Sequence, residues 1–230
     1  MNITRIDLDG VNSYLCKTAE GFVLIDTGGH LSRDKQFVNR REKLENELKK
    51  AGCWPGNLKL LVLTHGDSDH TANAAYIREK YKTMIAMHAG DAEMAKAPTT
   101  ERMMENFRFR MLRYRIVSPL VKKLVTRVIA KQLSDFESFE PDILLEDGSS
   151  LLDYGLDARV VHLPGHTDGS IGILLNDGSL ISGDTYTCSG KLLPAPNAKD
   201  FAALDKSIGR LKGMNIKKVY PGHGEPTGCS

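Results

Sequence analysis

The sequence contains no run of about 18 apolar residues, so no transmembrane helix is expected. Its first residues, MNITRIDLDGVNSYL, lack the basic start and the apolar core of a signal peptide. No internal period of about 20 to 50 residues indicates a repeat architecture. These absences predict a cytoplasmic protein without a membrane span.

Cysteine is also scarce. The four cysteines, Cys16, Cys53, Cys188 and Cys229, are widely spaced and form no Cys-x-x-Cys pair. This spacing favours free thiols over a disulfide framework or a zinc knuckle.

The remaining composition is ordinary. Hydrophobic residues make up 41% and charged residues 26% of the 230 positions, as in many globular proteins. This length suits one domain, and we expect a single domain over residues 1–230. The net charge of +2 gives no information about partners.

One short stretch is dense in potential metal ligands. His65, Asp67, Asp69 and His70 follow directly after the apolar run at 60–63, which predicts a buried strand. Carboxylates and imidazoles crowded together repel one another or remain unsatisfied unless a cation joins them. A divalent metal ion resolves this conflict.

Three later segments add one ligand-type residue each. They are Pro164-Gly165-His166, Gly183-Asp184 and Pro221-Gly222-His223. Each follows a hydrophobic strand-like run and includes a glycine, which tolerates a tight turn. Four strand ends therefore carry residues that suit metal binding.

Together these motifs resemble the metallo-β-lactamase superfamily, whose signature is His-x-His-x-Asp-His followed by a distant His, Asp and His. The resemblance extends from Asp26 to His223 and is closer to the glyoxalase II-like hydrolases, because Asp184 stands where zinc β-lactamases carry cysteine. It implies a four-layer αββα sandwich of α/β class and a centre for two divalent metal ions. In this family the residue at Asp26 supports the metal loop, although a simple turn role is equally compatible with the sequence.

The resemblance also implies a ligand set. The first ion is expected on His65 and His166, with Asp67 in the place of the family's second motif histidine. The second ion is expected on Asp69, His70 and His223, and Asp184 is expected to bridge both. A carboxylate is a harder ligand than imidazole, so iron or manganese is an alternative to the expected zinc.

The periodicity of the chain predicts mixed α and β structure. We expect strands at 11–16, 21–26, 60–63, 84–87, 142–145, 151–152, 158–163, 170–175, 180–182 and 218–220. Helices are expected at 33–51, 71–81 and 200–211. The ligand loop at 64–70 then lies where a strand passes into a helix.

A helical insertion is expected at about 99–140, with helices at 101–117 and from Pro119 onward. Residues 100–133 carry nine Lys or Arg and two acids, a local charge of +7, so the rest of the chain carries −5. A helical cover with a basic outer face is one interpretation. Others are a lid that attracts an anionic substrate, a membrane-surface contact, or a dimer contact. The oligomeric state stays open.

The leading functional hypothesis is a dinuclear metal-dependent hydrolase acting on a small ester, thioester, lactone or amide. The resemblance implies a metal-bridging hydroxide as nucleophile, with Asp69 as the catalytic residue that orients it and moves its proton. One alternative is a di-iron redox protein resembling the flavodiiron core, which carries an acidic residue at the position of Asp67. Another is a phosphodiesterase or nuclease of the same fold, although no nucleic-acid partner is expected.

Overall fold

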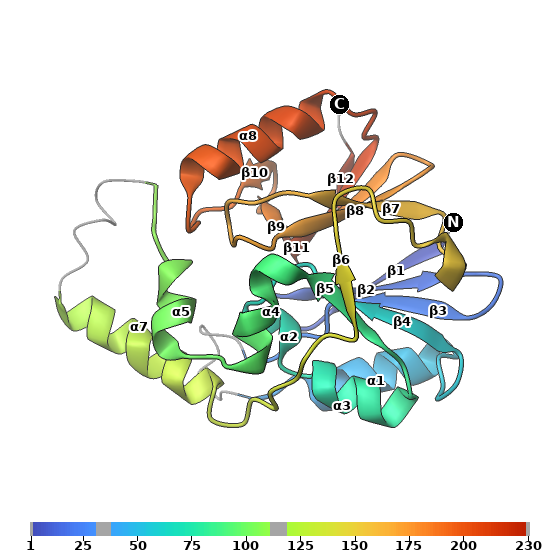
Figure 1. Cartoon of the computed structure of the whole chain (residues 1–230), viewed down its shortest axis with the longest axis horizontal. Helices are drawn as coiled ribbons and strands as arrows, with labels where there is room; N and C mark the ends of the chain where they lie inside the picture. The colour runs from blue at the N-terminus through green and yellow to red at the C-terminus, as the bar shows by residue number, and fades with distance from the viewer. Residues whose placement is uncertain (1, 31–37, 111–118, 229–230) are drawn as a thin grey trace.

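Two β-sheets lie face to face between outer helices in a computed structural model that describes residues 2–30, 38–110 and 119–228 (Figure 1). Helix α8 (Phe201–Lys212) covers one sheet, and helices α1 (Arg41–Lys50) and α3 (Ala74–Tyr81) cover the other (Figure 1). This arrangement is the four-layer αββα sandwich that the resemblance implied, so that expectation is confirmed.

The first sheet has the strand order β1-β2-β3-β4-β5-β6. Its strands are β1 (Asn2–Asp7), β2 (Asn12–Lys17), β3 (Phe22–Ile25), β4 (Leu58–Val62), β5 (Ile85–His88) and β6 (Ile143–Leu145). The first three strands form an antiparallel meander, and β3 to β6 pair in parallel. The carboxyl ends of β3, β4 and β5 therefore meet at one edge of the sheet.

The second sheet has the order β12-β11-β9-β8-β7, with β10 paired to β9. Its strands are β7 (Ala158–His162), β8 (Ile171–Leu175), β9 (Ser179–Cys188), β10 (Leu192–Pro194), β11 (Lys218–Gly224) and β12 (Thr227–Gly228). Strands β8 and β9 form the hairpin predicted across Asn176-Asp177-Gly178, where Gly178 has a φ of 91°.

The core follows the alternation of side chains along the strands. In β4, Leu60 and Val62 pack between the two sheets, and Leu61 packs toward α1 and α3. Because both faces of β4 are covered, its sequence is an uninterrupted apolar run. On the outer face of the second sheet, Val161 and Leu180 join a cluster with Leu211 of α8.

Some predicted elements differ from the structure. The strand expected at 151–152 is wrong, because η1 (Leu152–Tyr154) is a single 3-10 turn closed by Gly155 at a φ of 76°. The helix expected at 71–81 is divided into α2 (Ser68–Thr71) and α3. The helix expected at 33–51 is wrong at 38–40, which are not helical, and is found as α1 from Arg41 to Lys50; residues 31–37 lie outside the described ranges.

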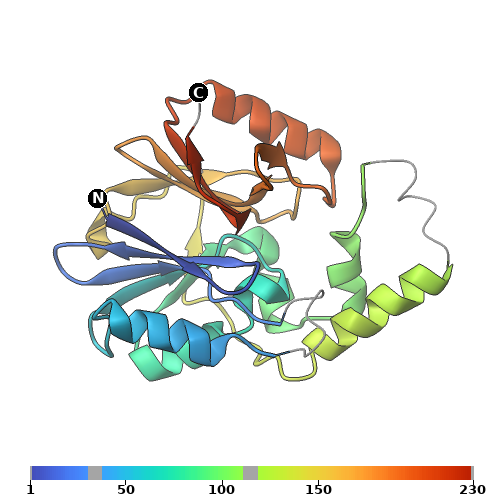
Figure 2. The ribbon, with the colours of Figure 1, turned by 180° about the vertical axis from the view of Figure 1, so that it is seen from behind.

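The predicted insertion lies beside the strand ends (Figures 1 and 2). After α4 (Ala89–Lys96), it contains α5 (Thr100–Glu105) and α7 (Pro119–Gln132). The helix expected at 101–117 is wrong at 107–110, because Phe109 pairs with Asn197 and the backbone N–H of Ala198 donates to the Arg108 carbonyl at 3.0 Å. The rest of that prediction, 111–117, lies outside the described part of the chain.

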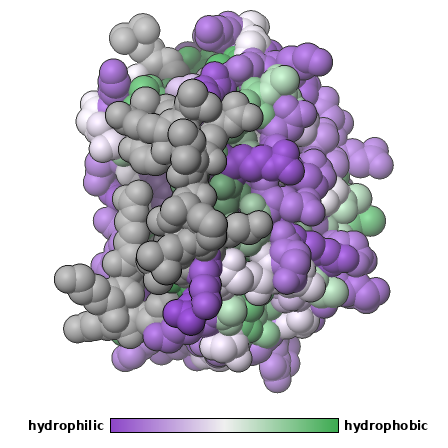
Figure 3. All heavy atoms as spheres, turned by 90° about the vertical axis from the view of Figure 1, so that its left-hand side faces the viewer, coloured by the Kyte–Doolittle hydropathy of each residue, from purple (hydrophilic) through white to green (hydrophobic). Residues whose placement is uncertain are grey.

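The insertion packs through a small apolar cluster of its own. Met103 of α5 and Ile129 of α7 are buried against Met94 of α4. Seen from this side, the coloured surface is mostly hydrophilic, with small apolar areas (Figure 3). No helix in the described ranges is long and apolar enough to span a membrane.

Candidate metal centre

All seven predicted ligand residues come together at one end of the sandwich. Four of them lie on the loop and short helix after β4, one lies on the loop after β7, one in β9 and one in β11. The structure gives three groups of ligand atoms, each within 4.8 Å of one another: His65 with Asp67 and His166, His65 with His70 and Asp184, and Asp69 with His70 and His223. The first and third groups contain the residues that the resemblance assigned to the two ions, and the second joins Asp184 to one histidine of each.

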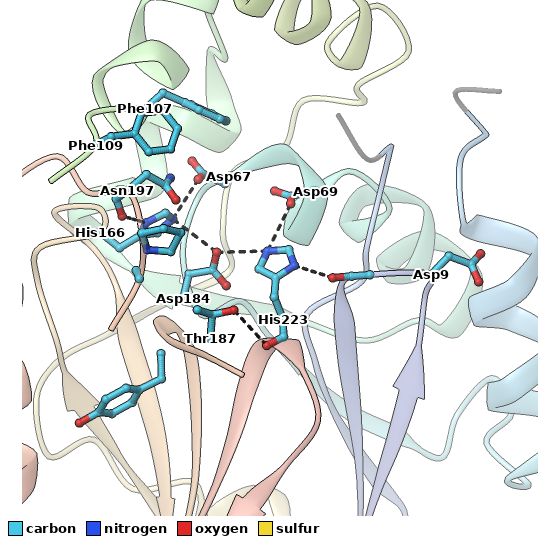
Figure 4. Close-up of a pocket in the computed structure, with 14 residues that line it drawn as sticks. Asp9, Asp67, Asp69, Phe107, Phe109, His166, Asp184, Thr187, Asn197 and His223 are labelled. Atoms are coloured by element: carbon cyan, nitrogen blue, oxygen red, sulfur yellow. Dashed lines mark hydrogen bonds and ion pairs between the residues drawn. The ribbon is translucent and has the colours of Figure 1, made fainter. Parts of the chain in front are cut away.

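Asp184 lies between the two outer groups (Figure 4). Its Oδ1 is 3.4 Å from Nε2 of His70, and its Oδ2 is 3.2 Å from Nε2 of His223. The same Oδ2 is 3.8 Å from Nε2 of His166. A single carboxylate therefore faces histidines of both groups.

The four histidines share one orientation. In each ring Nδ1 contacts an oxygen outside the cluster, and Nε2 faces the cluster. The Nδ1 partners are Thr64 Oγ1 for His65 at 3.0 Å, Asp26 Oδ2 for His70 at 2.9 Å, the Asn197 carbonyl for His166 at 3.1 Å and the Gly10 carbonyl for His223 at 2.5 Å. A histidine that donates Nδ1–H in this way leaves its Nε2 lone pair available to a metal ion.

The tautomer of His65 follows from Asp26. This buried carboxylate only accepts hydrogen bonds, so the Thr64 hydroxyl donates to its Oδ2 at 2.8 Å. The hydroxyl proton is then committed, and the Thr64 oxygen accepts from Nδ1–H of His65. Asp26 itself has a φ of 60°, and its Oδ1 accepts from the Thr64 backbone N–H at 2.8 Å. The supporting role implied for Asp26 therefore agrees with its contacts.

Two buried polar atoms in the cluster lack a hydrogen-bond partner among the residues that the structure describes. They are Nε2 of His65 and Oδ1 of Asp184. Buried polar atoms without a partner are costly, and a metal ion satisfies a lone pair as a hydrogen bond would. The donor set of imidazole nitrogens and carboxylate oxygens fits a divalent ion such as zinc, iron or manganese.

Without a metal ion, the pKa values of the four histidines differ widely. Burial lowers the pKa of His65 to about 3, and the charge of neighbouring His70 acts in the same direction. Burial also disfavours charge on His70, His166 and His223, but the surrounding carboxylates outweigh it. Their pKa values rise to about 9, 9 and 10 respectively.

The carboxylates differ as well. Burial raises the pKa of Asp69, which His70 and His223 only partly oppose. For Asp67, the hydrogen bond and charge of His166 outweigh burial, and its pKa is lowered. The pKa of Asp184 is held well below its usual range, because the charges of the nearby histidines outweigh burial.

Close packing leaves no room for a side chain at Gly222. A Cβ atom there would lie 2.1 Å from Oδ1 of Asp184 and 2.9 Å from Cε1 of His70. A glycine before His223 therefore lets β11 approach the cluster directly.

Sequence reasoning missed three residues that support the centre. Asp91 in α4 is buried and accepts from the backbone N–H groups of Gly66 and Gly169, each at 2.8 Å, and from the Thr167 hydroxyl at 2.6 Å. The other two are Asn106, which contacts Asp67, and Asn197, whose carbonyl contacts His166. Asp91 directly follows a strand end beside β4, so the strand-end rule that pointed to His65 could have found it.

A pocket of about 330 Å³ opens onto the centre. Phe107 and Phe109 of the insertion line the pocket on the side of His166 and Asp67 (Figure 4). Ala195 and Pro196 also line the pocket, and among the described residues no Lys or Arg does. The wall beside the first group is therefore aromatic and apolar.

This fold and this donor set define an α/β protein with clusters of residues that could hold metal ions. Residues 6–223 match the model of the metallo-beta-lactamase superfamily, and the chain belongs to that superfamily. The resemblance inferred from the motifs is therefore confirmed.

Curated relatives cover most of the chain. The Beta-lactamase-like protein 2 homolog of Drosophila melanogaster is 23% identical over 99% of this chain, which spans 64% of that relative's length. The acyl-coenzyme A thioesterase MBLAC2 of Bos taurus is 24% identical over 92% of this chain and 72% of its own. The hydroxyacylglutathione hydrolase GloC of Haemophilus influenzae is 26% identical over 89% of this chain and 80% of its own length. These last two are named hydrolases, in agreement with the expectation of an enzyme of this class.

Solved structures agree with the fold. The crystal structure of TTHA1623 in a di-iron-bound form superposes with a TM-score of 0.64 at 24% identity, covering 99% of this chain and 94% of that one. At this identity the likeness concerns the fold.

Proposed function

We propose that this protein is a dinuclear metal-dependent hydrolase that acts on a small ester or thioester, with lactones and amides as related substrates. The observation that carries the proposal is the convergence of seven ligand residues, with Nε2 of His65 and Oδ1 of Asp184 buried and without a hydrogen-bond partner among the described residues. The proposal treats the chain as one domain over residues 1–230.

Six of the seven proposed ligands divide equally between two ions, and the seventh is shared. His65, His166 and Asp67 hold the first ion, His70, His223 and Asp69 hold the second, and Asp184 serves both. These residues would hold two divalent ions, which would lower the pKa of a water molecule toward neutrality and polarise the scissile carbonyl group. Zinc is the proposed occupant, and the carboxylate of Asp67 also suits manganese or iron.

Asp69 is the proposed proton acceptor. Its side chain is 26% exposed and its Oδ2 lies 3.6 Å from Nε2 of His223, so it borders the pocket. A carboxylate at the pocket edge beside the second group of ligands is placed to take up a proton from the attacking water and to release it afterwards.

The pocket supports a substrate with an apolar acyl group. Phe107 and Phe109 offer aromatic surface beside the first group of ligands. The names of two relatives, an acyl-coenzyme A thioesterase and a hydroxyacylglutathione hydrolase, also favour thioesters. No lysine or arginine among the described residues lines the pocket, so its lining favours an acyl group over the phosphates of a nucleic acid.

Metal removal and reconstitution test the function. The protein stripped by a chelator and reloaded with zinc, manganese or iron is assayed on acyl thioesters, nitrophenyl esters and lactones of increasing acyl length. We expect activity that depends on about two ions per chain and falls at least about 100-fold in His166→Ala. A matched control is His162→Ala, which removes a histidine outside the cluster. Hydrolysis that survives complete metal removal would contradict the proposal.

A further inference from the structure

Asn106 belongs to the insertion, yet its side chain reaches the candidate metal centre. It directly follows α5 and is 2% exposed. Its Nδ2 donates to Oδ1 of Asp67 at 2.7 Å. Because a carboxylate only accepts hydrogen bonds, this contact fixes which side of the amide faces Asp67. The same nitrogen lies 4.0 Å from Sδ of Met94.

Four residues close a ring of hydrogen bonds around the first group of ligands. Asp67 Oδ2 lies 3.1 Å from Nε2 of His166, and Nδ1 of His166 contacts the Asn197 carbonyl at 3.1 Å. The Asn197 side chain then donates to the Asn106 carbonyl at 3.2 Å. Asn106 closes the ring on Asp67. Two candidate ligands are therefore held through two asparagines, one of which comes from the insertion.

The backbone around the ring is paired as well. Phe109 forms a bridge with Asn197, and the next backbone contact joins Ala198 N–H to the Arg108 carbonyl. These backbone contacts join the segment after α5 to the segment around Asn197, whose carbonyl contacts His166. They therefore keep Asn106 close to Asp67.

Asp67 does not use its carboxylate in the usual way for its position. It is the N-cap residue of α2, where an aspartate commonly accepts from the first backbone N–H groups of the helix. Here the side chain makes no such bond. Instead Oδ1 meets Asn106, and Oδ2 faces His166 at 3.1 Å and His65 at 3.8 Å.

We propose that Asn106 is a positioning residue for the first metal ion. By donating to Oδ1, it holds the carboxylate of Asp67 away from the N-terminus of α2 and keeps Oδ2 directed at His65 and His166. Oδ2 is then the one ligand atom that Asp67 presents. The insertion is in this way part of the metal centre. This inference rests on the metal centre proposed above.

Removal of such a supporting hydrogen bond typically lowers metal affinity about 10- to 100-fold. We expect this loss for the first ion in Asn106→Ala and in Asn106→Leu, which keeps the side-chain volume. The second ion, which Asn106 does not touch, changes by less than about twofold on the same scale. Affinities are measured by competition with a chromophoric chelator, with zinc and cobalt as the probes. The cobalt absorption spectrum reports a changed coordination of the first ion.

Met103→Ala is the matched control, because it removes a buried side chain from the same helix without touching the hydrogen bond. It should leave the affinity of the first ion near that of the wild type. A loss as large as that of Asn106→Ala would mean that loosened packing of the insertion is the cause, and would overturn the inference.

A double-mutant cycle with Asp67→Ala separates positioning from other effects. Without the carboxylate Asn106 has nothing to position, so Asn106→Ala should add almost no further loss. An equal loss in that background would overturn the inference, as would an unchanged first-ion affinity in Asn106→Ala while the wild type binds two ions. A wild-type protein that binds no ion would instead overturn the proposed function itself.

Discussion

Asp91 ties together the two loops that carry candidate ligands of the first ion. Its carboxylate accepts three hydrogen bonds, from the N–H of Gly66 between His65 and Asp67, and from Thr167 and Gly169 after His166. Asp91→Ala removes the partner of the buried N–H groups of Gly66 and Gly169, and the Thr167 hydroxyl keeps only its contact with Ser170 Oγ at 2.7 Å. Each orphaned donor costs about 1–3 kcal/mol, and because such losses are not additive we expect about 3–5 kcal/mol in total.

A loss of this size is a large part of the roughly 5–15 kcal/mol that stabilises a folded domain. It is measured by urea unfolding of the metal-free protein, followed by far-ultraviolet circular dichroism and fluorescence. Asp91→Asn should lose less, about 1–3 kcal/mol, because the amide keeps one acceptor oxygen but turns an NH₂ group toward a donor.

The control is Asp153→Ala, which removes an exposed carboxylate and should change stability by less than about 0.5 kcal/mol. If Asp91→Ala unfolded at the same urea concentration as the control, the three hydrogen bonds would contribute nothing measurable. The account of Asp91 as the link between the two loops would then be refuted.

Three further outcomes are expected. In Gly222→Ala the new Cβ would lie 2.1 Å from Asp184 Oδ1, so we expect less than about one-tenth of the wild-type metal content by elemental analysis, with an unchanged far-ultraviolet spectrum as the check on folding. The three histidines with pKa values of about 9 to 10 are protonated at neutral pH without metal, so metal binding should release protons and should strengthen as the pH rises. Calorimetry in two buffers of different ionisation enthalpy measures the number of protons released. A release of zero protons would contradict this prediction. Phe107→Ala should lower kcat/KM for long-chain acyl thioesters by about 5- to 30-fold and leave kcat/KM for acetyl thioesters nearly unchanged. An equal loss for both substrates would show that Phe107 does not recognise the acyl group.

The sequence allowed prediction of the parts of the centre that follow from local pattern. An uninterrupted apolar run predicted β4, and the polar residues after it gave His65, Asp67, Asp69 and His70. The family resemblance then supplied the grouping of these residues with three distant ones, which spacing alone does not give. The layers followed from the same resemblance, since periodicity indicated only mixed α and β structure.

The supporting residues could not be predicted in this way. Asn106 and Asn197 are 91 positions apart, and neither lies in a motif, so only the folded backbone shows that they meet. The extended pairing of Phe109 depends on Asn197, which is distant in sequence, and this tertiary contact overrides the local periodicity. The 3-10 turn at Leu152 is closed by local backbone hydrogen bonds that the apolar pattern does not indicate.

Asp67 and Asp69 offer the same chemical group to the two halves of the centre, and their surroundings push their pKa values in opposite directions. Asp67 is buried, meets His166 at 3.1 Å and Asn106 at 2.7 Å, and its pKa is lowered. Asp69 is partly exposed at the pocket, its nearest ion pair with His223 is 3.6 Å long, and its pKa is raised. Carboxylates separated in this way commonly divide acid–base work from charge stabilisation. The two carboxylates thus differ before any ion binds, in agreement with the proposal that Asp67 acts as a ligand and that Asp69 accepts and returns the proton.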